Sequence, residues 1–245
     1  MEIRLNKYIA ENSEYSRRKA DELIKEGKIR INGIHIVKLA TMVNSDEDVV
    51  SVNGKALKKR GVSMNYIALN KPPRYICTRS DELGRKTVME LIPKGKNLKP
   101  VGRLDKDTEG LLLFSNDGEF INQLTHPKFE CEKEYYAVVK GKFLLSSKNK
   151  LEKGIIIEDK KTSKSKIQII KASTEETRLR ITIHEGRKRQ IRKMFDYTDN
   201  PVKYLQRIRI GSIRLGSLPI GKYRLLSKAE INANKPPHLL HRKKH

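Results

Sequence analysis

Three carboxylates stand close together in GRLDKDTEGLLLF, the segment that covers residues 102–114. They are Asp105, Asp107 and Glu109, and the apolar run that follows them predicts a buried strand. Carboxylates at this spacing suit a hard cation, acid–base or nucleophilic catalysis, or a solvated turn. Because the chain carries a net charge of +24, a group of acids in front of a strand calls for a chemical explanation.

A calcium loop accounts for only part of this spacing. Asp105, Asp107, Glu109 and Gly110 match the early acidic and glycine positions of an EF-hand loop. The last position of that loop requires a bidentate glutamate, but here it is Asn116. The segment that follows also has the pattern of a strand and not of a helix, so we reject calcium.

Two further explanations concern the same loop. Asp105 and Asp107 could form the carboxylate pair of a glycoside hydrolase. Sugar sites usually carry aromatic platforms, however, and this chain has no tryptophan. Alternatively, the acids belong to a charged loop in solvent. Residue types alone leave this last alternative open beside a catalytic carboxylate.

The charge of the chain points to a polyanionic partner. Lys and Arg total 53 of the 245 residues, against 29 Asp and Glu, and nucleic acid is the usual partner of such a protein. A membrane is the rival, but no apolar run of about 18 residues exists to span one, and the N-terminus lacks a secretory signal. The two cysteines, Cys77 and Cys131, support neither a disulfide framework nor a zinc site. We therefore expect a soluble, cytoplasmic protein that does not bind a membrane.

Residues 1–60 have the pattern of a small independent unit. Two helices are expected first, the second with Ser16 as its N-cap and Gly27 at its end. Asn32-Gly33 and Asn53-Gly54 are strong signals for hairpins that follow. The predicted order is helix, helix and then a small sheet rich in hairpins.

This unit resembles the alpha-L RNA-binding module named after a small-subunit ribosomal protein. The resemblance rests on RLNKYIA and YSRRKADELIKEGKIRING and covers most of residues 3–50. It implies that the two-helix face docks on structured RNA, where cations neutralise phosphates and a helix start presents its amides. A merely soluble helix face is the alternative. The residues expected to contact RNA are Arg4, Lys7, Ser16, Arg17, Arg18 and Lys19.

Beyond a linker at residues 58–64, strands outnumber helices. Strands are expected in NYIALN, RYICTR, LLLFSN, EYYAVVK, SKIQIIK, RLRITIHE and KYLQRIRIGSIRL. Helices are expected after Asn116-Asp117-Gly118, in RKRQIRKMFDYT, and behind the capping box at Ser227. This mixture predicts an α+β fold with a largely antiparallel sheet. It also predicts a domain at residues 64–233 and a loose basic tail at residues 234–245.

GRLD followed by T-x-GLLL resembles the signature of the pseudouridine synthases. LNKPPRYICT, EKEYYAV and HEGRKRQIRKMF agree with that family in the same order, so the resemblance extends over most of residues 64–226. More narrowly, the chain resembles the branch that modifies ribosomal RNA as a stand-alone enzyme with an alpha-L module. The resemblance implies an isomerase that flips a uridine out of ribosomal RNA, or out of a ribosomal precursor particle, and rearranges its glycosidic bond. This chemistry needs no cofactor and no metal, because nothing is oxidised or hydrolysed.

The resemblance assigns the catalytic carboxylate to Asp105. It places Arg192 as the cation paired with Asp105, because a guanidinium opposes protonation of a carboxylate in an apolar pocket. Tyr135 corresponds to the active-site tyrosine, which could stack on the uracil, and Leu205 to the apolar wall beside the base. Whether Asp105 attacks the ring, attacks the sugar or removes a proton stays open. Asp107 and Glu109, outside the family's catalytic position, are expected to have only a local structural role.

The remaining expected contacts are with the pocket and with RNA. Arg103 is a candidate for propping the RNA open, and Gln190 is placed near the mouth of the pocket. The cations expected on the RNA backbone are Arg187, Arg189, Arg207 and Arg209. We expect a monomer, and we favour large-subunit over small-subunit ribosomal RNA as the substrate. The alternative from another class is a non-catalytic RNA-binding or ribosome-assembly factor on the same fold.

Overall fold

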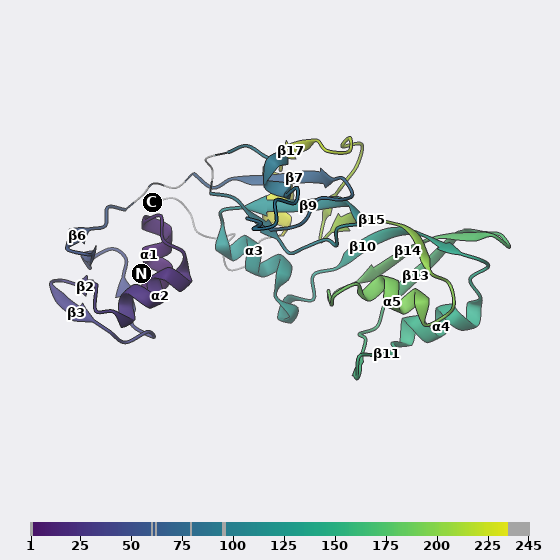
Figure 1. The fold of residues 1–245 in the computed structure, drawn as a ribbon, viewed down its shortest axis with the longest axis horizontal. Helices are drawn as coiled ribbons and strands as arrows, with labels where there is room; N and C mark the ends of the chain where they lie inside the picture. The colour runs from purple at the N-terminus through teal and green to yellow at the C-terminus, as the bar shows by residue number, and fades with distance from the viewer. Residues whose placement is uncertain (1, 60, 62, 79, 95–96, 235–245) are drawn as a thin grey trace. The chain divides into compact units, whose positions relative to one another are not determined.

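The computed structural model describes residues 2–59, 61, 63–78, 80–94 and 97–234 (Figure 1). Contacts within the chain divide it into one unit that ends at Ser63 and another that begins at Met64.

The first unit packs two helices against short strands. Its elements are β1 (Glu2–Arg4), α1 (Leu5–Asn12), α2 (Arg17–Lys25), β2 (Ile29–Ile31), β3 (Ile34–Ile36), β4 (Met42–Asn44), β5 (Val50–Val52) and β6 (Lys55–Ala56). The predicted N-cap is confirmed, because the Ser16 hydroxyl accepts a hydrogen bond from the Lys19 amide at 3.1 Å. Both predicted hairpins are present, β2–β3 at Asn32-Gly33 and β5–β6 at Asn53-Gly54, with positive φ at all four turn residues. The unit therefore follows the predicted order.

The second unit is built on a nine-stranded sheet with the order β13-β14-β10-β15-β9-β7-β17, to which β8 and β16 add at β9 and β15 (Figure 1). The strands are β7 (Tyr66–Lys71), β8 (Lys99–Val101), β9 (Glu109–Ser115), β10 (Lys133–Lys140), β13 (Lys166–Ala172), β14 (Glu176–Ile183), β15 (Val202–Ile210), β16 (Ile213–Arg214) and β17 (Tyr223–Leu225). Every pairing in this sheet is antiparallel except that of β15 with β9. The predicted α+β class with a largely antiparallel sheet is confirmed.

Helices cover the sheet in two places. They are α3 (Gly118–Thr125), α4 (Leu145–Lys153), α5 (Gln190–Asp196) and α6 (Lys228–Ala233), with 3-10 turns η1 (Val88–Leu91) and η2 (Pro127–Phe129) and the small hairpin β11 (Ile156–Ile157) and β12 (Lys160–Lys161). In Figure 1, α3 lies near β9, whereas α4 and α5 lie beside β13 and β14. The side chains of β9 alternate between two apolar clusters, Leu112 and Phe114 in one and Leu111 and Leu113 in the other. This burial on both faces explains the unbroken apolar run after the acidic loop.

Four sequence predictions need correction or qualification. RYICTR forms no strand, only an isolated bridge between Ile76 and Thr87. KYLQRIRIGSIRL is not one strand, because the chain turns at Gly211 (φ +53°) between β15 and β16. The helix predicted in RKRQIRKMFDYT begins only at Gln190, since the residue before it has a left-handed backbone. Of the predicted tail, Asn234 is buried and bonded to Ser212, and residues 235–245 lie outside the described residues.

A close approach of two strands brings the acidic loop to the centre of the sheet. Gly110 lies opposite Arg207 in the parallel pairing of β9 with β15. Its φ is +99°, and a Cβ atom here would lie 2.8 Å from the Arg207 nitrogen. Only glycine fits where the two strands approach this closely. The start of β9, and with it the acidic loop, therefore lies directly beside β15, which in turn pairs with β10.

Candidate active site

A buried lysine holds the loop that carries Asp105 by hydrogen bonds to its backbone. Lys71, at the end of β7, has no exposed surface, and its Nζ donates to the carbonyls of Thr108 at 2.9 Å, Pro72 at 3.0 Å and Lys106 at 3.3 Å. Burial lowers the pKa of this ammonium. Two of the three carbonyls belong to residues one and three positions after Asp105, so Lys71 fixes the backbone from which that carboxylate projects.

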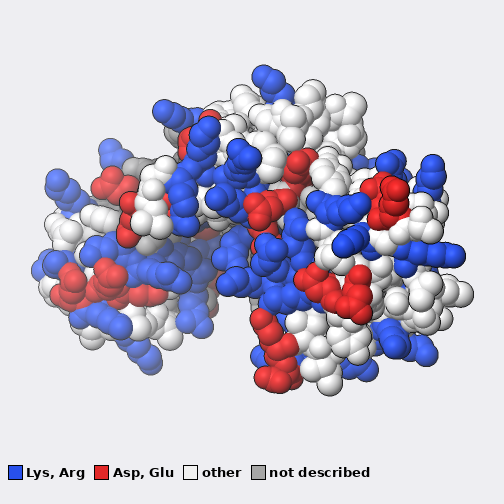
Figure 2. Space-filling view, turned by 45° about the vertical axis from the view of Figure 1, so that its right-hand side comes forward, with Lys and Arg blue, Asp and Glu red and all other residues white. Residues whose placement is uncertain are grey.

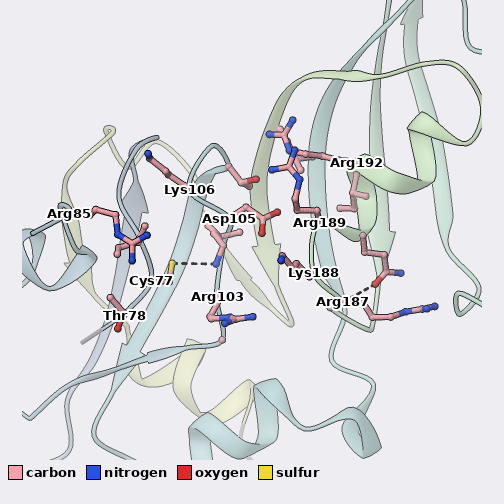
Figure 3. A pocket seen from close by; sticks show the side chains of 18 of the residues that line it. Cys77, Thr78, Arg85, Arg103, Asp105, Lys106, Arg187, Lys188, Arg189 and Arg192 are labelled. Carbon is pink, nitrogen blue, oxygen red and sulfur yellow. Dashed lines mark hydrogen bonds between the residues drawn. The ribbon is translucent and has the colours of Figure 1, made fainter. Parts of the chain in front are cut away.

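Two more bonds define the same loop. The Thr108 amide donates to the Asp105 carbonyl at 3.1 Å, which closes a tight turn. The Leu104 amide donates to the Cys77 sulfur at 3.3 Å (Figure 3). The loop is therefore tied to the segment after β7 as well as to β9, and the half-buried Asp105 side chain projects from a backbone with little freedom.

Asp105 lines a cavity of about 1170 Å³. The cavity walls include eight residues that the sequence assigned to the site: Arg103, Asp105, Tyr135, Arg187, Arg189, Gln190, Arg192 and Leu205. Figure 3 shows Asp105 pointing from its loop toward the wall that carries Lys188, Arg189 and Arg192. An anionic group thus faces a cluster of cations across a space large enough for a nucleotide.

The apolar wall of the cavity comes from two neighbouring strands. Tyr135 on β10 and Leu205 on β15 are both almost fully buried, and both line the cavity. Leu205 pairs with Ala137, two residues along β10 from Tyr135, so the two side chains lie on the same face of the sheet. A tyrosine ring and a leucine at this spacing form a surface on which a planar base can stack.

Arg192 does not form the predicted ion pair with Asp105. Its guanidinium donates instead to the carbonyls of Val202 and Asp107, each at 3.2 Å. Within the described part of the chain, no cationic atom lies within 4.0 Å of the Asp105 carboxylate. Burial lowers the pKa of Arg192, and the nearby charge of Asp105 opposes this shift, so the two groups interact without direct contact. Two donor groups of Arg192 are therefore taken by backbone carbonyls and not by the Asp105 carboxylate.

Gln190 and Arg187, which line the cavity, use their side chains in hydrogen bonds within the protein. Gln190 is buried, and its amide donates to Glu185 at 2.5 Å and accepts from the Arg187 amide at 3.1 Å. The Arg187 guanidinium donates to three carbonyls, those of Ile157, Lys160 and Lys161. Both side chains therefore shape the cavity wall. Their hydrogen bonds in this structure do not favour direct contact with RNA.

A family model described as RNA pseudouridylate synthase matches residues 65–197, and one described as S4 domain matches residues 3–50. The chain is 41% identical, over 93% of each sequence, to ribosomal large subunit pseudouridine synthase B of Bacillus subtilis. The chain belongs to the RNA pseudouridylate synthase family. An uncharacterized RNA pseudouridine synthase of Aquifex aeolicus is 42% identical over 94% of this chain and 93% of its own length. The solved structure of a pseudouridylate synthase superposes with a TM-score of 0.69, at 31% identity, over 95% of this chain and 99% of that one.

Two cations that the sequence placed on the RNA backbone are placed differently in this synthase. Arg207 is 2% exposed and lies inside the fold. Arg209 donates at 2.9 Å to both Glu132 and Glu134, so two carboxylates balance its charge. The two arginines are separated by one residue, so a regular strand would place them on one face. An irregularity in the pairing of β15 with β10 sets Arg207 opposite Tyr135 and Arg209 opposite Glu134, on opposite faces.

The acids beside Asp105 behave as the sequence predicted, with one addition. Asp107 is exposed and lies 3.9 Å from Arg189, whose side chain is 45% exposed. Glu109 starts β9 and accepts a hydrogen bond from the Tyr204 hydroxyl at 2.9 Å. Burial and this bond raise the pKa of Tyr204 to about 12. Asp107 therefore stays at the surface of the loop, and Glu109 is bonded to the neighbouring strand β15.

In the S4 unit, the predicted RNA-binding residues lie on α1 and α2 or directly before these helices. Arg18 is exposed, Arg17 donates to Asn6 at 3.2 Å, and Lys19 pairs with Glu22 at 2.9 Å. The Ser16 hydroxyl is used as the cap of α2, which argues for a structural role. Arg4 is exposed, and Lys7 lies 3.8 Å from Glu11 in an i, i+4 pair. Figure 2 shows Lys and Arg in large numbers on the displayed face, with smaller groups of Asp and Glu among them.

The structure adds residues that sequence reasoning did not assign to the site. They are Lys71 beneath the loop and Cys77, Thr78, Arg85, Lys106 and Lys188 on the cavity wall. Lys71 had a visible signal, because a lysine ends the otherwise apolar stretch YIALNK. Among the described residues, no group of His, Cys, Asp or Glu is arranged to hold a metal ion, and no helix has the length and apolar character needed to cross a membrane.

Proposed function

We propose that this protein converts a uridine of large-subunit ribosomal RNA into pseudouridine, with Asp105 as the carboxylate that acts on the nucleotide. The observation that carries the proposal is the position of Asp105 in the cavity, projecting from a loop fixed by Lys71 toward the cationic wall. The Bacillus subtilis relative and one from Vibrio vulnificus, 33% identical, are both named ribosomal large subunit pseudouridine synthase B. Their names support the choice of the large subunit.

The chemistry fits the residues. The bond between the ribose and a ring nitrogen breaks, and a bond between the ribose and a ring carbon forms. A proton leaves that carbon and the freed nitrogen takes one up, so atoms and electrons balance without an oxidant. Tyr135 and Leu205 hold the base, and Asp105 acts on the nucleotide opposite the positive charges of Arg189 and Arg192. The flipped base costs a few kcal/mol of lost stacking, which phosphate contacts elsewhere offset.

We also propose where and in what state the protein acts. The strongly basic composition suits naked ribosomal RNA or a precursor particle in the cytoplasm, with residues 1–60 adding affinity through effective concentration. We propose that the protein acts as a monomer. Sedimentation of the free protein and of its complex with RNA tests the oligomeric state.

The test is a pair of isosteric substitutions on one loop. Asp105→Asn is expected to abolish pseudouridine formation on unmodified large-subunit RNA while changing RNA affinity by no more than about twofold. Asp107→Asn is the matched control, because this exposed carboxylate lies two residues away, and its turnover is expected to stay near that of the wild type. Turnover by Asp105→Asn would move the chemistry to another residue. Tight binding without product on any ribosomal RNA would favour a non-catalytic binding factor.

A further inference from the structure

A second cavity of about 510 Å³ adjoins the first. Arg103, Tyr135 and Arg187 line both cavities, which therefore meet on either side of these side chains. The far wall of the second cavity is formed by the end of α3 and by Pro127, and its inner wall by Lys133 and Arg207. The proposed binding of the target uridine in the first cavity assigns no role to the second cavity.

Arg207 is a buried cation whose hydrogen bonding is incomplete. Its Nε donates to the Leu111 carbonyl at 2.8 Å, and its Nη1 reaches the Arg103 carbonyl only at 3.5 Å. The Nη2 atom is buried and has no hydrogen-bond partner in the part of the chain that the structure describes. A guanidinium that is 2% exposed with an unused donor is costly unless another group completes its bonding.

Lys133 places a second positive charge beside the first. Its Nζ donates to the Cys131 carbonyl at 2.8 Å and to the His184 carbonyl at 3.4 Å. Burial lowers the pKa of this ammonium, and the charge of Arg207 lowers it further. Across the described residues, neither cation has a carboxylate within 4.0 Å. Two like charges thus share a desolvated cavity without a counterion from the protein.

The carboxylates that line this cavity do not supply the missing charge. Glu185 is already bonded to the Ser163 amide at 2.8 Å and to Gln190, and it lies 3.5 Å from the Arg187 guanidinium. Glu130 is exposed at the rim. The inner wall is therefore cationic, and it suits a compact anion with several acceptor oxygens.

We propose that Lys133 and Arg207 bind the phosphodiester group of a nucleotide next to the uridine held in the first cavity. This inference rests on the proposed function, because the occupant of the first cavity sets which nucleotide reaches the second. Tyr135 lines both cavities, and its ring centroid lies 6.0 Å from the Arg207 guanidinium carbon. A strand whose base stacks on one side of that ring can place its backbone on the other. Lys133 and Arg207 then fix the register of the RNA and leave Asp105 to the chemistry.

The first arm of the test measures how RNA binding depends on salt. The full chain with Asp105→Asn is used so that no turnover occurs, and the probe is an unmodified large-subunit ribosomal RNA transcript. Adding Lys133→Gln is expected to reduce the slope of log affinity against log salt by about one, as the loss of one phosphate contact requires. Lys140→Gln is the matched control, because this exposed lysine ends the same strand and lines neither cavity. Equal slopes for the two variants would overturn the proposal.

The second arm needs no substitution of Arg207, whose loss could disturb the fold. An RNA fragment carries a neutral methylphosphonate at single linkages on either side of the modified uridine. Methylphosphonate substitution at one of these linkages is expected to lower the RNA affinity of the Asp105→Asn protein about tenfold. The same substitution should cause no further loss when Lys133→Gln is also present. Additive losses at every linkage would overturn the proposal.

The third arm separates RNA from a free anion and from failure of the proposed function. Inorganic phosphate is titrated to millimolar concentration while the NMR chemical shifts of Lys133 and Arg207 are followed. If these shifts reach saturation while methylphosphonate linkages leave RNA affinity unchanged, a free anion is the occupant and the inference fails. If no transcript yields pseudouridine with the wild type, the proposed function fails. The salt slopes still report whether the second cavity contacts RNA, so the two failures differ.

Discussion

Replacing Lys71 by methionine should damage both stability and turnover, although the side chain lies beneath the proposed active-site loop. Lys71→Met keeps an unbranched side chain only one heavy atom shorter and removes three donated bonds, at 2.9, 3.0 and 3.3 Å. A hydrogen bond from a charged donor contributes roughly 1.5 to 3 kcal/mol net, and two of these bonds are well formed. The expected loss is near the low end of their sum, about 3 kcal/mol, because methionine also removes the desolvation cost of the ammonium.

The effect on turnover follows from the position of the bonds. Two of the three carbonyls belong to Lys106 and Thr108, the residues one and three positions after Asp105. A displacement of about 1 Å at a reacting group can cost roughly 100-fold in rate. We expect Lys71→Met to lower kcat by about that factor with little change in RNA affinity.

Denaturant unfolding followed by circular dichroism, together with single-turnover pseudouridine assays, measures both effects. Lys140→Met is the control, because it removes an exposed ammonium from the same unit and should leave stability and rate nearly unchanged. If Lys71→Met unfolds at the wild-type denaturant concentration and retains its kcat, the buried lysine does not hold the loop, and the account of how Asp105 is positioned is wrong.

Three other predictions concern separate parts of the chain. Gly110→Ala should cost roughly 3 kcal/mol, because φ is +99° and the new Cβ would lie 2.8 Å from a backbone nitrogen of β15; thermal melts compared with Gly118→Ala, where the added Cβ meets nothing within 4 Å, check this. Deleting residues 1–60 should weaken RNA binding and flatten its salt dependence, and an unchanged slope would show that this unit does not touch RNA. Arg224 lowers the pKa of Glu230 to about 2 from its usual 4.5, so the stability that Glu230 contributes should be complete above pH 4.5 and lost as the pH falls toward 2. An NMR titration of Glu230 with a midpoint near 4.5 would contradict this.

Local elements followed well from the sequence. Ser16 and Ser227 cap their helices, and both Asn-Gly turns are present, because these features depend only on backbone geometry within a few residues. RYICTR failed as a strand although its composition suits one. Its backbone atoms bond instead to loop residues such as Lys86 and Lys106, which no short-range pattern reveals.

The candidate site divides in the same way. The resemblance carried by GRLD, EKEYYAV and the QIR triplet implied that Asp105, Tyr135 and Arg192 share one site, and all three line one cavity. The expected ion pair between Asp105 and Arg192 is absent in the described structure, because the carbonyls of Val202 and Asp107 take up the guanidinium. Residue type predicted the neighbours but not the partner of each hydrogen bond.

By itself the sequence determined the family, the positive charge, the local caps and turns, and the doubly buried strand that follows the acidic loop. Tertiary structure alone decided that Lys71 would hold that loop, and that Arg207 would be buried while Arg209 met two carboxylates. The physical reason is range. Helix and turn preferences act over three or four residues, whereas strand register, a local irregularity in pairing and the desolvation of a charge depend on segments that only the folded chain brings together.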